Sequence, residues 1–399
     1  MKTVVTIGLG YIGLPTSALM ASNGLSVRGI DINQSVVDTI NLGNVHIIEP
    51  DLDKIVKRVV IEGKLKAYTK IQKGDVYLIV VPTPFKENFQ PDISLIQEAT
   101  LNIIPLLKSE DLLIIESTSP VGTTDTIRDL IYQHRPELKE KVRIAYCPER
   151  VLPGNVLHEL VHNDRVIGGI DNLSTECAAE FYRLFVKGEL HKTNAKTAEM
   201  CKLTENASRD AQIAFANELS LICKEADINV WELIRLANKH PRVNILNPGI
   251  GVGGHCIAVD PYFITSKYPN QSILIQTSRK INNQKTEWCL SEIIQIIETY
   301  KSQKRALPKI GLLGIAFKPD IDDTRESPAL KIAIKLKTLY PNNVLVFEPN
   351  VEKNNKVEIT PFISENIKTL DVIIKLVNHK QFYDLNFDSK LYYSFASET

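Results

Sequence analysis

The first 31 residues contain a pattern that few folds other than a dinucleotide-binding α/β sheet can satisfy. A short β-branched run, Val4–Ile7, leads directly into the turn Gly8-Leu9-Gly10-Tyr11-Ile12-Gly13. A helical segment follows over residues 14–22, and a second strand over Leu25–Ile30 ends in Asp31. The order strand, G-x-G-x-x-G, helix, strand and acid within about 30 residues is the fingerprint of a Rossmann βαβ unit.

Each position of this turn has a mechanical reason. Gly8 makes the tight turn, Gly10 lets a pyrophosphate approach the backbone, and Gly13 lets helix and strand pack closely. Tyr11 and Ile12 lie where the helix begins, so backbone N–H groups and the positive end of the helix dipole are offered to the phosphates. The turn therefore predicts dinucleotide binding.

Asp31 and three threonines complete the predicted cofactor site. The Asp31 carboxylate can accept hydrogen bonds from ribose hydroxyls and would repel a 2′-phosphate, which predicts NAD rather than NADP. Later strands end in polar segments that place Thr83, Thr118 and Thr124 beyond their carboxyl ends, where open α/β sheets bind ligands. The ordinary turn chemistry of Pro, Thr and Gly explains these threonines equally well.

The C-terminal quarter repeats this alternation without the glycine fingerprint. Strand Ile310–Leu313, a helix starting near Ser327-Pro328, and strand Val344–Phe347 ending in Glu348 follow the order of the first unit. Lys318 stands near the place of the lost glycines and can act as a point charge for phosphate. We therefore expect a second Rossmann-like unit that binds a different phosphate-bearing molecule.

Between these units, residues 195–226 read as one long helix. Its small apolar residues favour close packing of one helix on another, including packing across a dimer. Lys202, Asn206 and Arg209 fall at i, i+4 and i+7 and so share one stripe of this helix. Without further context, such a stripe usually indicates a solvated face.

Together these elements predict an α/β protein with two Rossmann-like doubly wound domains, joined by a long central helix and a helical middle domain. We expect an NAD-binding domain over residues 1–192, a central helical domain over 193–302 and a C-terminal domain over 303–399. Lys+Arg and Asp+Glu both number 47, so the balanced charge gives no reason to expect nucleic acid or an anionic membrane as a partner. The sequence shows no signal-peptide pattern and no apolar run of about 18 residues, which predicts a soluble cytoplasmic protein.

A glycine-rich segment carries the candidate nucleophile. In Gly249-Ile250-Gly251-Val252-Gly253-Gly254-His255-Cys256, four glycines let the backbone approach a ligand, and Asp260 follows the cysteine by four residues. On a helical turn Cys256 and Asp260 share a face, the layout of a nucleophile beside a group that handles protons. A buried, inert cysteine is the alternative. The six cysteines show no C-x-x-C pair and no zinc-like spacing, so we expect reduced thiols and no metal site.

Seven motifs follow one another along nearly the whole chain. They are G-L-G-Y-I-G-L-P (8–15), V-P-T-P (81–84), E-S-T-S-P-V-G (116–122), C-P-E-R-V-L-P-G (147–154), E-M-C-K-L-T-E-N (199–206), G-V-G-G-H-C-I-A-V-D (251–260) and F-K-P-D-I-D-D-T-R-E-S-P (317–328). In this order they resemble the nucleotide-sugar 6-dehydrogenases, the family that includes UDP-glucose and GDP-mannose dehydrogenases.

The resemblance implies a four-electron oxidation of a primary alcohol at C6 to a carboxylate, with two NAD+. It implies that Cys256 attacks the aldehyde to give a thiohemiacetal and then a thioester, which water hydrolyses. Lys202, Asp260 or a water between them would receive the alcohol proton. Lys202 and Asn206 would donate to each oxyanion, and Glu149 or Asp260 would orient the water.

Within this family the chain is most similar to members that act on UDP-N-acetyl-D-mannosamine, for surface polysaccharide precursors. Members acting on glucose or mannose nucleotides usually carry a second glutamate a few residues after Glu149, where this chain has Pro153. The resemblance places the following residues around the sugar and diphosphate: Arg150, Val151 through its backbone, Lys202, Asn206, Arg209, His240, Arg242, Gly253 and Lys318. It also implies that Arg325 reaches a cofactor phosphate, and that the protein is a homodimer or a larger assembly of dimers.

Three alternatives stay open. UDP-N-acetyl-D-glucosamine or UDP-glucose would be the substrate in place of the mannosamine sugar. A 3-hydroxy-acid dehydrogenase shares the dinucleotide unit and a helical lysine but performs one oxidation without a cysteine nucleophile, and a nucleotide-sugar-binding regulator needs no cysteine. The family also usually reaches a final strand and an Asp–Gly segment after Phe382, whereas this chain reads Leu391–Thr399, so we expect a shortened last strand.

Overall fold

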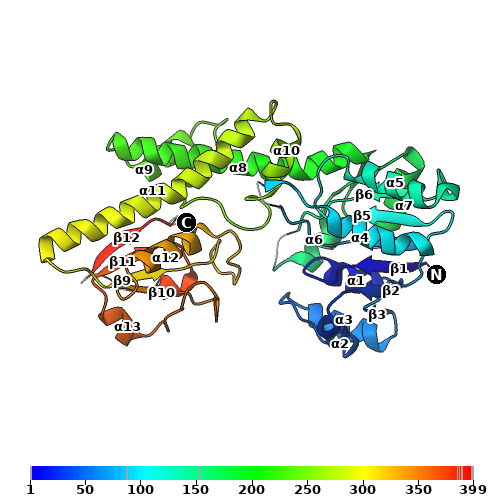
Figure 1. Cartoon of the computed structure of the whole chain (residues 1–399), viewed down its shortest axis with the longest axis horizontal. Coiled ribbons are helices and arrows are strands. Elements are labelled where there is room, and N and C mark those ends of the chain that lie inside the picture. The colour runs from blue at the N-terminus through cyan, green and yellow to red at the C-terminus, as the bar shows by residue number, and fades with distance from the viewer. Residues whose placement is uncertain are drawn as a thin grey trace. The chain divides into compact units, whose positions relative to one another are not determined.

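A computed structural model of the chain describes residues 2–86, 89–151, 154–383, 385, 387 and 390–396, without the side chain of Ser364. The chain divides into two compact units, residues 1–205 (unit 1) and 206–399 (unit 2). Each unit is described by itself, and most of its helices and strands are labelled in Figure 1.

Unit 1 is built on an eight-stranded sheet in the order β3-β2-β1-β4-β5-β6-β7-β8. Its strands are β1 (Thr3–Ile7), β2 (Ser26–Ile30), β3 (Leu65–Tyr68), β4 (Val76–Ile79), β5 (Leu112–Ile115), β6 (Arg143–Tyr146), β7 (Arg165–Gly169) and β8 (Leu190–Asn194). Neighbouring strands pair in parallel except β6 and β7, which are antiparallel. The order from β3 to β6 is that of a dinucleotide-binding sheet.

Helices cover both faces of this sheet because its strands are apolar on both sides. Successive strand residues such as Val4 and Val5 enter different core clusters, one on each face of the sheet. The helices are α1 (Gly13–Ser22), α2 (Gln34–Asn41), α3 (Leu52–Ile61), α4 (Ser94–Ile103), η2 (Ile104–Leu106), α5 (Thr123–His134), η3 (Pro136–Leu138), α6 (Val156–His162) and α7 (Asn172–Tyr182). The first core includes residues of α1, α2, α3, α6 and α7, and the second those of α4 and α5.

The long helix expected over residues 195–226 is α8 (Ala195–Glu225). It begins after Asn194, whose side-chain Oδ1 accepts a hydrogen bond from the N–H of Thr197 at 2.9 Å, as an N-cap residue does. The division between the two units falls inside this helix, between Glu205 and Asn206.

Unit 2 contains a four-stranded parallel sheet in the order β10-β9-β11-β12. The strands are β9 (Ile310–Leu313), β10 (Val344–Phe347), β11 (Val372–Lys375) and β12 (Leu391–Ser394), and the helices after α8 are α9 (Val230–Ala237), α10 (Asp260–Lys267), α11 (Ile273–Lys304), α12 (Pro328–Leu339), α13 (Ser364–Lys368) and η4 (Lys380–Phe382). Apolar residues of α11 and α12 pack with the sheet in one core, and leucine, isoleucine and phenylalanine side chains form a second, smaller one. The last strand is β12, four residues long and parallel to β11.

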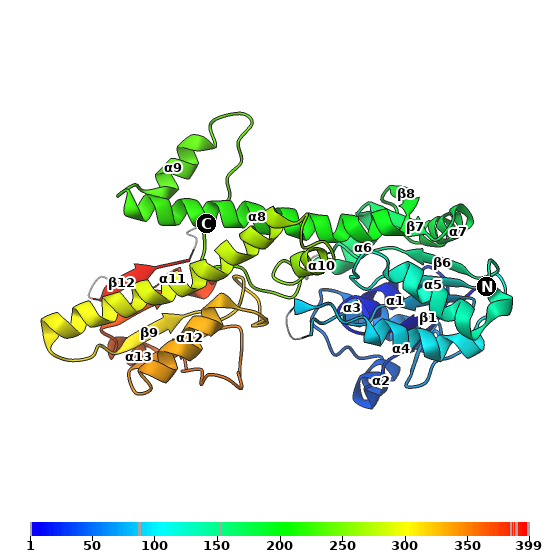
Figure 2. The ribbon, with the colours of Figure 1, turned by 45° about the horizontal axis from the view of Figure 1, so that its top comes forward.

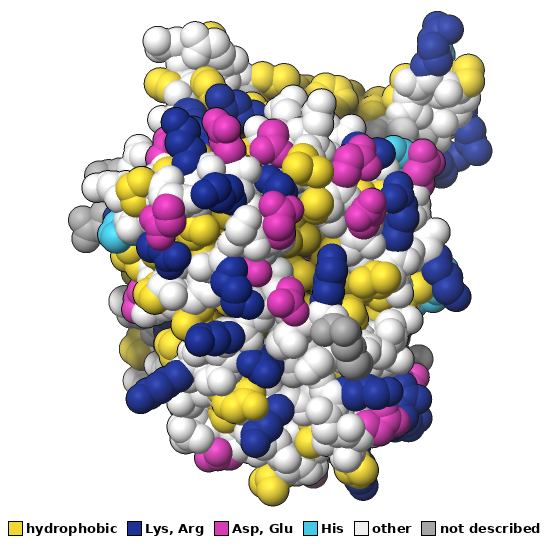
Figure 3. All heavy atoms as spheres, turned by 90° about the vertical axis from the view of Figure 1, so that its right-hand side faces the viewer, with side chains coloured by type: hydrophobic (Ala, Val, Ile, Leu, Met, Phe, Trp, Pro, Cys, Tyr) yellow, Lys and Arg dark blue, Asp and Glu magenta, His cyan; other side chains and the backbone are white. Residues whose placement is uncertain are grey.

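The α/β class predicted from the sequence, with two Rossmann-like units, a long central helix and a helical middle region, is confirmed. Among the described residues, no helix is long and apolar enough to cross a membrane. On the face that Figure 3 shows, basic and acidic side chains are interspersed and hydrophobic ones are scattered among them. This mixture matches the formal net charge of zero.

Candidate functional site

In the glycine turn after β1, packing requires two of the glycines, and the third leaves space for a ligand. A Cβ on Gly8, which has φ of +97°, would lie 2.3 Å from the carbonyl oxygen of Val80, and one on Gly13 would lie 1.8 Å from the oxygen of Gly8. The fold itself therefore requires both glycines. A Cβ on Gly10 would meet no described atom within 4 Å, so glycine there fits the close approach of a ligand.

Three further residues surround this turn. Tyr11 is exposed and Ile12 is half-buried, and both directly precede α1. Asp31 follows β2, and its Oδ2 accepts a hydrogen bond from the N–H of Leu9 at 3.1 Å while Oδ1 accepts one from Asn33 at 2.9 Å. The carboxylate thus fixes the turn and stays half-exposed. A turn of this geometry next to a helix N-terminus fits an NAD-type cofactor.

The three threonines have different surroundings. Thr83 and Thr118 are half-buried in the segments after β4 and β5. Thr124 is fully buried, and its Oγ1 donates to Glu199 at 2.7 Å. The Glu199 carboxylate, which comes from α8, also accepts the backbone N–H groups of Thr124 at 2.7 Å and of Gly122 at 2.5 Å. Glu199 therefore caps the N-terminus of α5, and cofactor contact by Thr124 stays a prediction.

Glu149 lies in a buried charge network. Its Oε2 accepts a hydrogen bond from Nη1 of Arg165 at 2.8 Å, and its Oε1 accepts the N–H of Arg150 at 2.7 Å. The Arg165 guanidinium lies over the ring of Tyr182, 5.1 Å from its centroid, and the Tyr182 hydroxyl donates to Glu116 at 2.5 Å. Burial raises the pKa of Glu116 to about 7, although the positive charge of Arg165 opposes this rise.

Glu116, Arg165 and Glu199, which are structural partners of predicted site residues, were not predicted from the sequence. All three occur in motifs or segments that resemble the family, but a buried carboxylate and a surface carboxylate look alike in one sequence. The positions of two of them in the sequence could have indicated such a role. Glu116 directly follows an apolar strand, and Glu199 lies three residues before Lys202 on the long helix.

The guanidinium of Arg150 has two hydrogen-bond partners within unit 1. Nη1 of Arg150 donates to Glu205 at 2.7 Å, and Nη2 donates to the backbone oxygen of Asp164. Val151 is half-buried against the core, and Pro153, on which the substrate prediction rests, lies outside the described residues. Lys202 is half-buried on α8.

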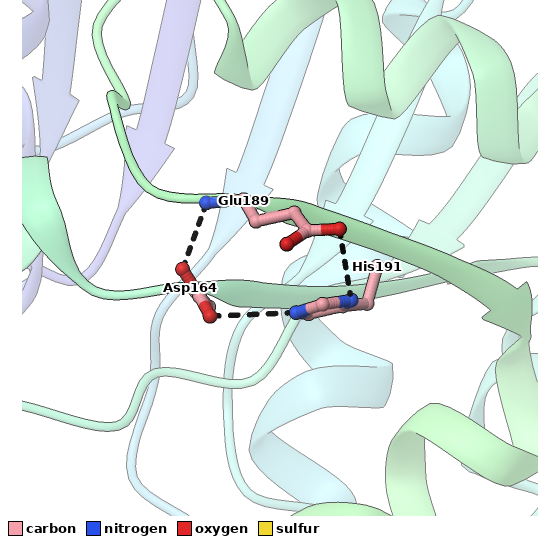
Figure 4. Close-up of side chains that lie close together, drawn as sticks. All are labelled: Asp164, Glu189 and His191. Atoms are coloured by element: carbon pink, nitrogen blue, oxygen red, sulfur yellow. Dashed lines mark hydrogen bonds and ion pairs between the residues drawn. The ribbon is translucent and has the colours of Figure 1, made fainter.

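Next to Arg150, Asp164, Glu189 and His191 form an exposed cluster whose ligand atoms lie within 4.8 Å of one another (Figure 4). The Asp164 carboxylate accepts the N–H of Glu189 at 2.8 Å and contacts Nε2 of His191 at 3.4 Å. These mutual contacts account for the closeness of the three side chains, and exposed acidic groups are common without a bound metal ion.

The candidate nucleophile Cys256 lies in unit 2, one turn ahead of α10. Its carbonyl oxygen accepts hydrogen bonds from the N–H groups of Val259 at 3.0 Å and Asp260 at 2.8 Å. The side chain is half-buried. Asp260 is buried, and its Oδ2 accepts a hydrogen bond from Nδ2 of Asn206 at 2.5 Å. The structure thus brings Asn206 and Asp260 into contact one turn from Cys256.

Two other cysteines, Cys147 and Cys289, are buried and unreactive. Burial raises the pKa of Cys147 to about 12 and that of Cys289 to about 11, so both are neutral thiols at physiological pH. All six cysteines are described, and none of them forms a disulfide.

Two of the glycines before Cys256, Gly253 and Gly254, are required by close packing within unit 2, and ligand approach at this segment stays a prediction. A Cβ on Gly253 would lie 2.7 Å from Cβ of Phe317, and one on Gly254, with φ of +83°, would lie 2.9 Å from the Phe317 ring. The N–H of Gly254 donates to the oxygen of Arg325 at 2.9 Å. A Cβ on Gly249 would meet no described atom within 4 Å. The segment 317–328 therefore supports the nucleophile segment directly.

The remaining predicted substrate residues of unit 2 are exposed. His240 and Arg242 lie in the turn after α9, and Nδ1 of His240 accepts the N–H of Arg242 at 3.3 Å. Arg209 and Lys318 also reach solvent. Arg325 is 57% exposed and holds Asp323 in a two-pronged ion pair, with its closest nitrogen and oxygen atoms 2.6 Å apart.

The acid of the second Rossmann-like unit, Glu348, is saturated by the protein itself. Its Oε2 accepts the N–H groups of Ile315 at 2.7 Å and Ala316 at 3.0 Å, and contacts Nε2 of His379 at 3.1 Å. Its Oε1 accepts the N–H of Asn350 at 2.9 Å. Burial opposes ionisation, but these hydrogen bonds hold the pKa of Glu348 below its ordinary value.

Comparisons with known proteins agree along the whole chain. Models of the UDP-glucose/GDP-mannose dehydrogenase family match its NAD binding domain at residues 2–186, its central domain at 196–284 and its UDP binding domain at 311–393. UDP-N-acetyl-D-mannosamine dehydrogenase of Escherichia coli K12 is 50% identical, over 97% of this chain and 96% of its own. NDP-N-acetyl-D-galactosaminuronic acid dehydrogenase of Ralstonia nicotianae is 48% identical, over 97% and 93%. The native structure of UDP-N-acetyl-mannosamine dehydrogenase from Staphylococcus aureus superposes with a TM-score of 0.88 at 39% identity, over 99% and 98%.

Proposed function

Because this chain belongs to the UDP-glucose/GDP-mannose dehydrogenase family, we propose that it oxidises UDP-N-acetyl-D-mannosamine at C6 to UDP-N-acetyl-D-mannosaminuronate, with NAD+ as oxidant. The identity of about one half to enzymes named for this substrate, over nearly the full chain, supports the choice of sugar. The observation that carries the chemistry is the Asn206–Asp260 hydrogen bond one turn from Cys256.

In the first half of the reaction, the C6 alcohol becomes an aldehyde. The bound cofactor supplies the acceptor for each of two hydrides. Lys202, Asp260 or a water between them receives the hydroxyl proton, and Lys202 and Asn206 offer N–H groups to the alkoxide oxygen. Gly8, Gly10, Tyr11, Ile12, Gly13 and Asp31 are the residues we assign to the dinucleotide, with Thr83, Thr118, Thr124 and Arg325.

In the second half, the sulfur of Cys256 adds to the aldehyde carbon, and the carbonyl oxygen takes up a proton. Loss of the second hydride from C6, with loss of the hydroxyl proton to Lys202, Asp260 or a water between them, turns this thiohemiacetal into a thioester. A water held by Glu149 or Asp260 then attacks the thioester carbon, the C–S bond breaks, and the thiol and carboxylate are released. The sum is two NAD+ reduced per sugar.

We assign the substrate's remaining contacts to Arg150, Val151, Arg209, His240, Arg242, Gly253 and Lys318. We also propose three functional domains: residues 1–192 for the cofactor, 193–302 for the catalytic lysine and cysteine, and 303–399 for the nucleotide sugar. The family models give a similar division by their own matched ranges.

We propose that the protein acts in the cytoplasm as a homodimer, or as a larger assembly of dimers, joined through α8. Phe215 and Ile222, seven residues apart on α8, are 52% and 56% exposed, which suits burial against a second copy. Light scattering of the purified protein tests this, and a monomer at micromolar concentration would contradict it.

A steady-state panel of UDP-sugars with NAD+ tests the proposed substrate. We expect the highest kcat/KM for UDP-N-acetyl-D-mannosamine, and about two NADH formed per sugar consumed. Faster oxidation of UDP-glucose or UDP-N-acetyl-D-glucosamine would overturn the choice of sugar. A ratio near one would instead indicate a single-step dehydrogenase of the 3-hydroxy-acid type.

The role of the thiol is tested with the 6-aldehyde of the same UDP-sugar. Reduction of the aldehyde by NADH needs no nucleophile, whereas oxidation by NAD+ with water does. Cys256→Ala should therefore keep aldehyde reduction and lose aldehyde oxidation. Equal rates of oxidation in the variant and the unmodified enzyme would rule out the thioester route.

A further inference from the structure

Within unit 2, the helices α8 and α11, which Figure 2 labels, carry five buried polar side chains that face one another. We call Asp210, Asn217, Arg279, Asn282 and Thr286 the α8–α11 polar row. None of them is more than 8% exposed. The two α8 members lie seven residues apart, and the α11 members follow at i, i+3 and i+7, so each set lies on one helix face.

Hydrogen bonds connect four of the five side chains to one another, and Thr286 lies one turn beyond Asn282 on α11. Nη1 of Arg279 donates to Oδ1 of Asp210 at 2.6 Å. Nδ2 of Asn282 donates to the same Oδ1 at 2.7 Å and to the backbone oxygen of Asp210 at 3.0 Å. Nδ2 of Asn217 then donates to Oδ1 of Asn282 at 2.8 Å. Both asparagine amides are therefore oriented by defined partners.

The row ends on two consecutive residues of the nucleophile segment. Oδ1 of Asn217 accepts the N–H of Gly249 at 2.9 Å, and Oγ1 of Thr286 donates to the carbonyl oxygen of Ile250 at 2.8 Å. The next residue, Gly251, has φ of +126°, and a Cβ there would lie 2.3 Å from Oγ1 of Thr286. The backbone at residues 249–251 is thus fixed by side chains of both long helices.

Such a row is costly to bury, because polar groups taken from water stabilise little even when they are paired. Two helices that needed only to pack would use apolar side chains at these positions. A network in which each member has one orientation gives a defined geometry instead. Here that geometry is transmitted to the segment that ends in Cys256.

We propose that Asn217 and Thr286 are positioning residues that place Cys256 for attack on the aldehyde. They bind the backbone of Gly249 and Ile250 at the start of the segment. At its end, the backbone oxygen of Arg325 accepts the N–H of Gly254, and the carbonyl oxygen of Cys256 accepts the N–H of the first residue of α10. This inference rests on the proposed function, because it assumes that Cys256 is the nucleophile.

Thr286→Val tests the proposal, because it keeps the shape of the side chain and removes the hydroxyl that holds Ile250. Thr286→Ser restores a hydroxyl and should restore function. Ser278→Ala is the matched control: Ser278 lies on the same helix and is 3% exposed, but its hydroxyl donates to Leu274 of its own helix at 2.8 Å. All three remove or alter one buried group of similar size.

The readout is the ratio of aldehyde oxidation by NAD+ to aldehyde reduction by NADH, measured on one preparation. We expect Thr286→Val to lower this ratio about tenfold, since a misplaced nucleophile slows only the step that uses it. Thr286→Ser and Ser278→Ala should stay within about twofold of the unmodified enzyme. A partly unfolded preparation lowers both rates together and leaves the ratio unchanged.

Alkylation of Cys256 by iodoacetamide, followed by mass spectrometry, gives a second readout that needs no cofactor or substrate. We expect a changed alkylation rate in Thr286→Val only. An unchanged oxidation-to-reduction ratio in Thr286→Val would overturn the positioning role while the proposed function stands. If Cys256→Ala keeps aldehyde oxidation, the proposed function fails first and the inference with it.

Discussion

Glu116 makes the stability of unit 1 depend on pH in an unusual direction. Its carboxyl is fully buried directly after β5, an interior strand of the sheet, and burial raises its pKa from the ordinary 4.5 to about 7. Between these two values the folded protein holds a proton that the unfolded chain releases. The contribution of Glu116 to the free energy of unfolding therefore falls as pH rises from about 4.5 to about 7, and is constant above that.

The size of this effect follows from the two pKa values. The difference between 4.5 and about 7, at about 1.4 kcal/mol per pH unit, corresponds to about 3 kcal/mol. Glu116→Gln carries no titrating proton and keeps an oxygen that accepts from Tyr182. The variant should therefore gain stability relative to the unmodified protein as pH rises, by an amount that approaches about 3 kcal/mol between pH 4.5 and 8.

The assay is urea unfolding of both proteins at several pH values, with hydrogen exchange of peptides from β5 and β6 to report on unit 1. The difference between the two proteins isolates Glu116. This matters because burial lowers the pKa of His46, and His46 therefore adds stability as pH rises through its own titration. A difference that does not change with pH would show that the charge of Arg165 keeps Glu116 ionised, and would refute the reasoning.

Three other predictions follow from buried contacts. Gly10→Ala should leave the melting temperature unchanged but raise the KM for NAD+ at least about tenfold, because a methyl group there meets only the ligand. Gly254→Ala should lower the melting temperature and the alkylation rate of Cys256, because a methyl group there meets the Phe317 ring. Gly249→Ala should leave both unchanged, and thermal unfolding of the two variants checks the difference. Arg279→Met leaves the Asp210 carboxylate buried without its cation and should cost about 3–5 kcal/mol in urea unfolding, and a loss below about 1 kcal/mol would contradict the pairing.

Local patterns were sufficient to predict most of the framework. The strands at residues 310–313 and 344–347 have the predicted bounds. A short apolar run bounded by turn residues is typical of a buried strand. The long helix was predicted to within one residue at its end. Strands β3, β7 and β8 were not predicted. Strand β8 is mostly exposed and lacks the apolar run that would indicate a strand.

The partners of the site residues could not be predicted, because they depend on contacts across long sequence separations. Asn206 was assigned to one stripe with Lys202 and Arg209, but its bond is to Asp260, 54 residues away. The polar row was missed for the same reason, although Asp210 and Asn217 continue the helical spacing of Asn206. Polar residues at core spacing on two helices were the available signal.

The saturation of Glu348 has a consequence for how many dinucleotides one polypeptide can take up. Four groups already bind that carboxylate, the backbone N–H groups of Ile315, Ala316 and Asn350 and the side chain of His379, so ribose hydroxyls would have to displace the protein's own groups. Calorimetric titration with NAD+ should therefore reach a plateau at one equivalent per chain. A nucleotide at the second sheet would depend on cations such as Lys318 instead, and its affinity should decline as salt is added.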